Sequence, residues 1–445
     1  GKRFKAEEFT DGAIDELRLF NRSLTPIEAT WLHEPARASL DAGRLKDGLA
    51  QMLAQRDAQL LQAKADLKMA RDEENRVASA IRQVLVMEDT AKPRPTFVLD
   101  RGQYDAPTTP VEPAALNRVF RWDEGYGRNR LGLAKWLFDR RNPLTARVYV
   151  NRLWAQHFGN GIVETVDDFG TQGSNPVNPE LLDYLAVEFV KSGWDIKHLQ
   201  KLIVMSATYR QSSQVSAEAL QADPRNLYVA RGPRFRLSAE QIRDNALMAG
   251  GLLLRRVGGD SVYPYQPPGV WEAAGSSAAK YPLGVPEDDT HRRTLYTFVK
   301  RAAPPPNMQV FDFADRQVTT VQRRISNTPL QALVLMNDPQ FVEAYRALAV
   351  RVAQEAGDPS RQLELLFRLA TRRHPSSEEM SVMEGYRDKA LASLRRDPAS
   401  AAKLLATTSG ASARPLDANL DAADVAATML VAAAVMNSPA AYTLR

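Results

Sequence analysis

The spacing of apolar residues predicts a mainly helical domain over residues 128–445, with a few short strands and a long irregular loop. Within it, apolar positions recur about every three or four residues between residues that cap helices and glycines or prolines that stop them. The expected helix starts include Asn178, Asp195, Ser238, Thr328 and Asp338. Near the C-terminus, the Ala-rich run ADVAATMLVAAAVMNSP predicts a buried helix.

One predicted helix, over residues 143–158, carries much of the candidate chemistry. Asn142 and the proline after it are typical of a helix start, and the glycine that follows is typical of a helix end. Arg147, Asn151 and Trp154 share a face of this helix. Because large aromatic residues alternate so closely with arginine and asparagine, we expect a helix buried on most sides, with its polar groups hydrogen-bonded inward.

The first 127 residues fall into three segments. Residues 1–34 contain AIDELRLFNRSLTPIEATWL, which resembles the closing strand and short capping helix of a laminin-G-like or concanavalin-like β-sandwich. Residues 35–89 predict one long helix or a helical hairpin, which we interpret as a structural spacer, with an oligomerising coiled coil as the alternative. Residues 90–127 are rich in proline and predict an extended connector, in which PTFVLDRGQYD forms a strand, a turn and a short return.

A long irregular segment covers residues 255–310 and is rich in glycine, proline and aromatic residues. Its aromatic residues include Tyr263, Tyr265, Trp271 and Tyr281. Such long loops inside a domain are usually functional or cover another element, so these rings are expected either to stack on sugars or to pack under the loop. The run HRRTLYTFVKR predicts a strand that emerges from this segment.

Composition excludes several kinds of site. The hydrophobic fraction of 44% and charged fraction of 25% are ordinary for a globular protein, and no window approaches the roughly 18 apolar residues of a membrane span. The net charge of +5 is not gathered into a basic block, so no nucleic-acid partner is expected. The chain has 0 cysteines, and its 5 histidines lack the spacing of metal ligands. We therefore expect no metal or cofactor in this chain.

Arginines and carboxylates remain as candidates. The candidate binding residues are Arg147, Asn151, Arg152, Asp167, Asp168, Tyr209, Arg210, Arg243 and Asp244, and no catalytic residue is assigned. Further acidic candidates are Glu180, Asp183 and Glu240. A pair of such acids could hydrolyse a glycosidic bond. Alternatively, the acids neutralise buried arginines without performing chemistry. In that case Arg147 is expected to pair with Asp168 first and with Asp167 second.

Four long segments resemble one family. They are NPLTARVYVNRLWAQHFGNGIVETVDDFGTQG, NPELLDYLAVEFVKSGWDIKHLQKLIVMSATYRQSS, RFRLSAEQIRD and ISNTPLQALVLMNDPQFVEAYRALA. The family is the planctomycete-type domain of unknown function 1553, which is found in large exported proteins with cytochrome-c-like domains. The resemblance runs from about Arg94 to the C-terminus. It implies an extracytoplasmic location, at the cell surface or in the periplasm, with upstream domains of the same polypeptide as partners, among them a c-type haem domain.

The chain departs from the family pattern at two places. Val177 and Asn178 stand where the family commonly has Ser-His, and Thr319 or Thr320 stands in place of a common cysteine. Both departures argue against an essential thiol or histidine in this chain. Because the chain begins GKRFKAEEF without methionine, we interpret it as the C-terminal portion of a longer protein.

Two classes of function are consistent with these patterns. The first is a non-catalytic structural or binding module of an exported multidomain protein that is associated with complex carbohydrate. The second is an enzyme that acts on polysaccharide or sulfated glycan through the Arg/Asp cluster around Arg147 and Asp168. An open polar cleft between these groups would favour the enzyme, whereas a filled, hydrogen-bonded core would favour the module.

Overall fold

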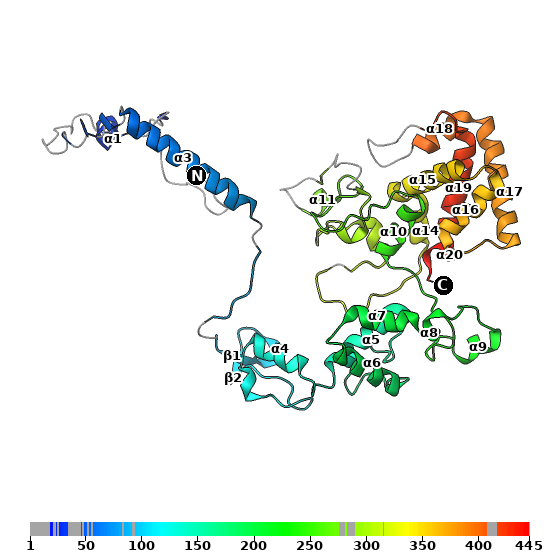
Figure 1. Ribbon diagram of the computed structural model, residues 1–445, viewed down its shortest axis with the longest axis horizontal. Coiled ribbons are helices and arrows are strands. Elements are labelled where there is room, and N and C mark those ends of the chain that lie inside the picture. The colour runs from blue at the N-terminus through cyan, green and yellow to red at the C-terminus, as the bar shows by residue number, and fades with distance from the viewer. Residues whose placement is uncertain are drawn as a thin grey trace. The chain divides into compact units, whose positions relative to one another are not determined.

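The computed structural model describes the chain from residue 94 onward except for 276–280, 283–289, 315, 407–415 and 445 (Figure 1). Before residue 94 it describes 18–20, 24, 26–33, 46, 49–50, 53–54, 57–81 and 84–90. The chain divides into two compact units, Gly1–Pro110 and Val111–Arg445. The described residues are mostly helical and contain one sheet of 2 strands, which confirms the mainly α fold class.

The first unit contains two described helices and most of a small hairpin. The helices are α1 (Pro26–His33) and α3 (Ala58–Ala80), and the hairpin joins β1 (Thr96–Leu99) to β2 (Pro107–Val111) through the 3-10 turn η2 (Asp100–Gly102). α1 lies where a short capping helix was expected. Of the run before it, where a strand was expected, only residues 18–20 and 24 are described, and they are not in a strand. The hairpin agrees with the strand, turn and return that PTFVLDRGQYD predicts.

The N-terminal part of the second unit is built around one small core. Its elements are η3 (Glu124–Tyr126), α4 (Arg130–Phe138), α5 (Thr145–Phe158), α6 (Pro179–Lys191), α7 (Ile196–Met205), α8 (Ala207–Arg210) and α9 (Ala217–Ala222). Apolar side chains of α5, α6 and α7 form a single buried cluster, with Val150 and Leu199 fully enclosed. Trp154 and Phe158 stack within it at a centroid distance of 4.1 Å. Burial of such large rings is the main stabilising contribution of this core.

A larger core holds the C-terminal part together. Its elements are α10 (Ala239–Ala249), α11 (Val270–Ala273), η4 (Thr294–Tyr296), α13 (Pro306–Gln309), α14 (Pro329–Asn337), α15 (Pro339–Glu355), α16 (Pro359–Thr371), α17 (Ser377–Arg396), α18 (Pro398–Ala406), α19 (Ala422–Met436) and α20 (Pro439–Tyr442). α19 packs against α15, α17 and α18, and most of its side chains are buried. The Ala-rich run therefore forms the buried helix that its composition predicts, because small side chains allow close packing on several faces.

Local capping signals place most of the helix starts. Asn178 and Asp195 accept hydrogen bonds from free backbone N–H groups at the starts of α6 and α7. Ser238 and Gln241 form the expected capping box at the start of α10. α5 begins at Thr145 rather than at residue 143, since the side-chain oxygen of Asn142 accepts from the N–H of Leu144 (3.0 Å) and forms a turn before the helix.

One prediction about the irregular segment and one about the helix before it are wrong. The run HRRTLYTFVKR forms no strand: it folds into the 3-10 turn η4 and contributes isolated bridges, Arg292 to Leu254 and Thr297 to Val262. Its residues favour a strand, but they pair only with single residues and not with a complete neighbouring strand, so no sheet forms. α10 ends at Ala249 instead of near Leu253, where two glycines follow it.

Candidate functional site

α5 and the loop after it are joined by a buried amide. Asn151 is 0% exposed; its Nδ2 donates to the carbonyl oxygen of Val163 (2.9 Å), and its Oδ1 accepts from the N–H of Val163 (2.8 Å). A Cβ atom at Gly161 would lie 2.3 Å from that carbonyl oxygen, so only glycine fits at that position. Asn151 therefore fixes the returning loop and is not open to a ligand.

Arg147 does not pair with either predicted aspartate. Its Nε donates to Asp183 Oδ1 on α6 (2.6 Å), and its Nη1 donates to the carbonyl oxygen of Pro143 (2.6 Å). The prediction of Asp168 or Asp167 as the partner is wrong, because α6 packs against α5 and brings Asp183 to the arginine first. The Arg147 and Asp183 side chains are 34% and 54% exposed, so this is a surface pair rather than a buried one.

The two aspartates lie in a surface turn. Asp167 is exposed, and Asp168 Oδ1 accepts from the N–H of Gly170 (2.7 Å) while its carbonyl oxygen accepts from the Thr165 hydroxyl (2.7 Å). Asp168 thus shapes its own turn, as aspartate commonly does. The structure does not bring the two acids and Arg147 together in a polar cleft.

The remaining candidates near this core are also separated. Arg152 and Arg210 are exposed, on α5 and α8. Tyr209 packs edge-on against the rings of His157 (5.6 Å) and Phe158 (5.9 Å) at the margin of the core. Burial lowers the pKa of His157 and so favours its neutral form. These contacts assign Tyr209 to packing.

Arg243 and Asp244, neighbours on α10, both bind the segment that leads into η4. Arg243 Nη2 donates to the carbonyl oxygen of Thr290 (2.7 Å), Nη1 donates to the Thr294 hydroxyl (3.1 Å), and Nε donates to the Gln340 side chain (2.5 Å). Asp244 Oδ1 accepts from the Thr294 N–H (2.8 Å) and hydroxyl (2.6 Å). The two side chains hold this segment against α10.

Burial decides the electrostatics of this network. Arg243 is 4% exposed, and its burial lowers the pKa of its guanidinium, although the negative charge of nearby Asp244 opposes that shift. Burial also raises the pKa of Asp338, at the start of α15. The cavity beside Arg243 measures about 10 Å³, which is room for about one water molecule. Gln266 Nε2 and Thr297 Oγ1, from two residues that line that cavity, have no hydrogen-bond partner among the described residues.

The aromatic residues of the irregular segment pack on one another. Tyr263 stacks with Phe298 (5.2 Å) and meets Tyr281 edge-on (5.8 Å), while Trp271 contacts Tyr281 (5.2 Å) and Phe298 (5.8 Å). Trp271 is 6% exposed, and the Tyr281 hydroxyl donates to the carbonyl oxygen of Pro264. These rings form a minor core under the segment, so their faces are not free to stack on a sugar.

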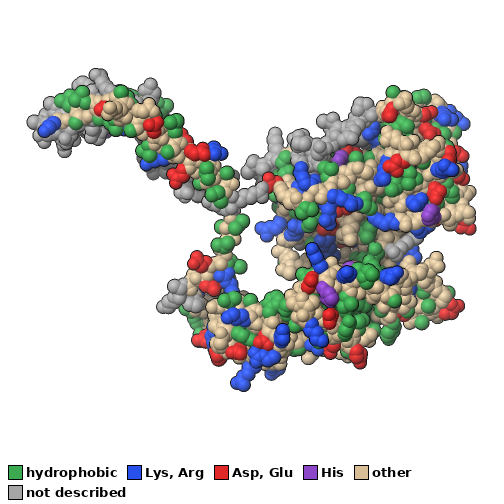
Figure 2. Space-filling model, viewed as in Figure 1, with side chains coloured by type: hydrophobic (Ala, Val, Ile, Leu, Met, Phe, Trp, Pro, Cys, Tyr) green, Lys and Arg blue, Asp and Glu red, His purple; other side chains and the backbone are tan. Residues whose placement is uncertain are grey.

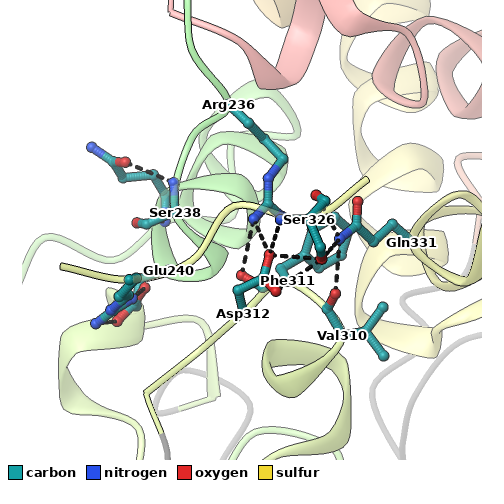
Figure 3. Close-up of polar contacts among 10 residues, drawn as sticks. Arg236, Ser238, Glu240, Val310, Phe311, Asp312, Ser326 and Gln331 are labelled. Carbon is teal, nitrogen blue, oxygen red and sulfur yellow. Dashed lines mark hydrogen bonds and ion pairs between the residues drawn. The ribbon is translucent and has the colours of Figure 1, made fainter. Parts of the chain in front are cut away.

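A further polar cluster, centred on Asp312, was not predicted from the sequence (Figure 3). Arg236 Nη2 donates to Asp312 Oδ2 (2.5 Å), and Ser326 donates to the same carboxylate from its N–H (2.9 Å) and its hydroxyl (2.8 Å). Gln331 Nε2 adds hydrogen bonds to the carbonyl oxygens of Val310 (3.0 Å) and Ser326 (3.2 Å). The cluster therefore joins the segment before α10, the segment after α13 and the start of α14.

Within the cluster, the Asp312 carboxylate has several hydrogen-bond donors, whereas two nitrogen atoms of Arg236 have no described partner. Burial raises the pKa of Asp312, but the hydrogen bonds from Ser326 and the charge of Arg236 outweigh it and hold this pKa below its usual value. The Arg236 side chain is only 9% exposed, yet its Nε and Nη1 atoms have no hydrogen-bond partner among the described residues. Because buried donors are rarely left unpaired, this guanidinium has capacity for a water molecule or a ligand group.

The cluster closes the neck of a loop, described at residues 313–314 and 316–325, which we call the arginine loop. Its residues from 316 to 325 are exposed. An open hollow of about 410 Å³ is lined by Ala314, residues 316–320 and Arg323. The guanidinium carbons of Arg316 and Arg323 lie 5.4 and 5.3 Å from the ring centre of Phe313, which is buried at the base. A loop whose ends are fastened while its tip is exposed is a common site of function.

The two arginines that line the hollow, Arg316 and Arg323, differ in their ion pairs. Arg323 donates twice to the carboxylate of Glu240 on α10 (2.7 and 2.9 Å), and these hydrogen bonds raise the pKa of Arg323. Arg316 is exposed and forms no ion pair with a described residue. The hollow is therefore positively charged chiefly through Arg316, with Arg323 held in place by Glu240.

Only weak signals in the sequence point to this loop. Thr319 and Thr320 drew attention as replacements for a cysteine, and both line the hollow. Asp312 has a left-handed backbone (φ 59°), which is uncommon for residues other than glycine and is favoured by aspartate. No local pattern joins Asp312 to Arg236, because they are far apart in the sequence.

The described residues contain no group of 3 or more histidine or acidic side chains that could hold a metal ion. Within the same part of the chain, no helix is both long and apolar enough to cross a membrane.

A model of the family described as "Protein of unknown function (DUF1553)" matches residues 129–386, which is more than half of the chain. The match begins at the cap of α4 and ends within α17, so it includes the smaller core, the arginine loop and part of the larger core, whose α18, α19 and α20 lie beyond it. The chain therefore belongs to this family. The comparisons with curated proteins and with solved structures found no match.

Proposed function

We propose that this chain is a non-catalytic binding module of an exported multidomain protein and that it binds acidic groups of complex carbohydrate through the arginine loop. The observation that carries the proposal is the combination of an open, positively charged hollow with a neck fastened by the partly buried Asp312–Ser326 contact. A rigid neck lowers the entropy lost when the loop binds a ligand. The extracytoplasmic location and the upstream domains as partners are part of this proposal, and they rest on the family resemblance.

Arg316 is the residue we expect to contact the ligand. It is exposed, it has no ion-pair partner among the described residues, and its guanidinium lies over Phe313. A guanidinium held in this way presents a planar fork that suits carboxylate or sulfate groups. Thr319, Thr320 and Gln317 line the same hollow and carry groups able to hydrogen-bond sugar hydroxyls.

The composition of the hollow supports binding rather than catalysis. Its described lining consists of alanine, valine, arginine, glutamine and threonine side chains. None of these supplies a general acid or base near neutral pH, and a threonine hydroxyl without an adjacent base is a weak nucleophile. A ligand held there has no described group in the lining to take or give a proton.

The alternative, an enzyme that uses the Arg/Asp cluster, has less support. Arg147 pairs with Asp183 on the surface of α6, and Asp168 completes its own turn. The aromatic cluster around Trp271 is likewise engaged in packing. An enzyme would need these groups to converge on an open cleft, and they lie apart along the chain's surface and core.

The proposal is tested by measuring binding of the full chain to heparin, polygalacturonate and dextran, which are sulfated, carboxylated and neutral. We expect binding to at least one acidic polymer, weaker binding at high salt, and no binding to dextran. Arg316→Ala should weaken binding several-fold. Arg152→Ala is the matched control, because Arg152 is also exposed but lies in the cluster of the alternative hypothesis.

Three results would contradict the proposal. Absence of binding to both acidic polymers would exclude acidic carbohydrate as the ligand. A loss of binding with Arg152→Ala but not with Arg316→Ala would show that the ligand binds at α5 and not at the arginine loop. Release of new reducing ends from any of the polymers would favour the enzyme.

A further inference from the structure

α3 is a helix without a buried side chain. It runs from Ala58 to Ala80, and Asp57 caps it by accepting from the N–H groups of Gln59 (2.8 Å) and Leu60 (3.0 Å). No residue of α3 is buried, and apolar side chains are visible on its surface in Figure 2. Isolated helices gain little stability in water, since most helical stability comes from packing of an apolar face. Within the part of the chain that the structure describes, α3 therefore presents an apolar face without a packing partner.

That face has the spacing of a coiled coil. The seam consists of Leu60, Ala63, Leu67, Ala70 and Val77, which are spaced alternately by three and four residues except where Glu74 interrupts them. Leu67 and Val77 are 50% and 48% exposed. Apolar residues at this spacing form a single stripe that faces a second helix, and the alternation of leucine with alanine allows the two helices to approach closely.

We propose that α3 pairs with α3 of a second copy of this chain in a parallel, two-stranded coiled coil. A second copy is the occupant that the charges beside the seam favour. In a parallel pair in register, Asp66 of one helix faces Arg71 of the second copy, and the symmetry repeats the contact on the other side. Both side chains are exposed and so are accessible to this pairing.

The antiparallel arrangement is disfavoured by the same charges. If two antiparallel copies overlapped over the whole of α3, Asp66 would face Glu73 of the second copy. Arg71 would then lie beside Lys64 of the second copy. Both contacts join like charges, which destabilises the pairing and selects the parallel orientation.

Glu74 limits the affinity of the pair. It occupies a seam position, where it would face Glu74 of the second copy in the parallel register. A polar residue at one seam position specifies register at a cost in stability. We therefore expect a reversible dimer, and Glu74→Leu should tighten it. Dimerisation would also present two arginine loops to one polymer, although the pairing of α3 does not depend on that ligand.

The dimer is tested by sedimentation equilibrium of the full chain over a range of concentrations. We expect a monomer–dimer equilibrium that Leu67→Asp abolishes. Met69→Asp is the matched control: Met69 is 62% exposed on the same helix but lies outside the seam, so the dimer should persist. A chain that stays monomeric at all concentrations would overturn the proposal, as would equal loss of the dimer in both variants.

The orientation is tested separately. Asp66→Arg should weaken a parallel dimer, because it sets a second positive charge against Arg71, whereas it would strengthen an antiparallel dimer, in which position 66 faces Glu73. The chain has 0 cysteines, so in the variant Leu60→Cys any disulfide between two copies must join position 60 to position 60. In a parallel pair Leu60 meets Leu60 of the second copy and the variant cross-links on oxidation. In an antiparallel pair these positions would lie roughly 25–30 Å apart, and a dimer that does not cross-link would overturn the parallel arrangement.

Discussion

Asn151 and Val163 exchange two hydrogen bonds through the core of the second unit, from Nδ2 to the carbonyl oxygen (2.9 Å) and from the N–H to Oδ1 (2.8 Å). Asn151→Ala would leave both backbone groups of the buried Val163 unpaired. We expect a loss of about 3 kcal/mol in unfolding free energy, measured by urea denaturation. Gln156→Ala on the exposed side of the same helix should stay within about 0.5 kcal/mol.

A second variant separates hydrogen bonding from volume at the same site. Asn151→Asp keeps the shape and the acceptor for the Val163 N–H, but it sets a carboxylate oxygen against the Val163 carbonyl oxygen. Because an unpaired buried charge is costly, we expect at least as large a loss as for alanine. A smaller loss than for Asn151→Ala would contradict the role assigned to Nδ2.

Arg147→Ala should have a small effect. Its partner Asp183 has a lowered pKa because of their hydrogen bond, but both side chains are substantially exposed, and such pairs typically contribute less than about 1 kcal/mol. We expect Arg147→Ala to lower the unfolding free energy, measured by urea denaturation, by this amount. Raising the salt concentration should change the unfolding free energy of the variant little. A loss of about 3 kcal/mol or more would show that the arginine is effectively buried.

The features predicted correctly from the sequence are those that depend on neighbours along the chain. Asn178 and Asp195 cap their helices because a side-chain oxygen reaches an N–H two or three residues away. Gly159 ends α5 because its backbone has φ of 82°. The Ala-rich run is buried because its residues are small and apolar on all faces.

Side-chain partners that lie far apart in the sequence could not be predicted from local sequence patterns. The sequence offers several acidic residues as partners for Arg147. The packing of α6 against α5 places Asp183 next to it. The cluster that closes the arginine loop depends on Arg236 and Asp312 being adjacent in space, which no periodicity encodes. Among the predicted site residues, Arg147, Asn151 and Asp168 therefore each contact a different group, and no local pattern in the sequence shows which.

Ser326→Ala should loosen the neck of the arginine loop. The variant removes the hydroxyl that donates to Asp312 (2.8 Å) and accepts from Gln331 (3.2 Å), while the backbone contact stays. We expect a loss of about 1–2 kcal/mol in local stability. The measurement is hydrogen exchange of residues 313–326, which should become faster, whereas Thr319→Ala on the exposed loop should leave the Ser326 amide protected. Unchanged exchange in Ser326→Ala would mean that the cluster does not hold the loop.

The contact between Glu379 and Arg373 predicts a defined pH dependence. The hydrogen bonds from Arg373 lower the pKa of Glu379 to about 2, from a usual value of 4.5. A carboxyl whose pKa is depressed by folding stabilises the fold above its unfolded pKa, and this contribution is lost as the pH falls through the folded pKa. The relevant window therefore runs from about pH 4.5 down to about pH 2.

Glu379→Gln isolates that contribution. The amide oxygen can still accept from the Ser376 N–H, which donates to the Glu379 side chain over 2.9 Å, so chiefly the charge is removed. The Arg373 and Glu379 side chains are 33% and 36% exposed, and solvent screening limits the effect to about 1 kcal/mol. We expect the wild-type chain to be the more stable by that amount at pH 6. The difference should shrink as the pH is lowered from 4.5 toward 3, as followed by urea denaturation at each pH. A difference that grows on acidification would have the wrong sign for a depressed carboxyl pKa, and the stabilising role of the Glu379 carboxylate would then have to be abandoned.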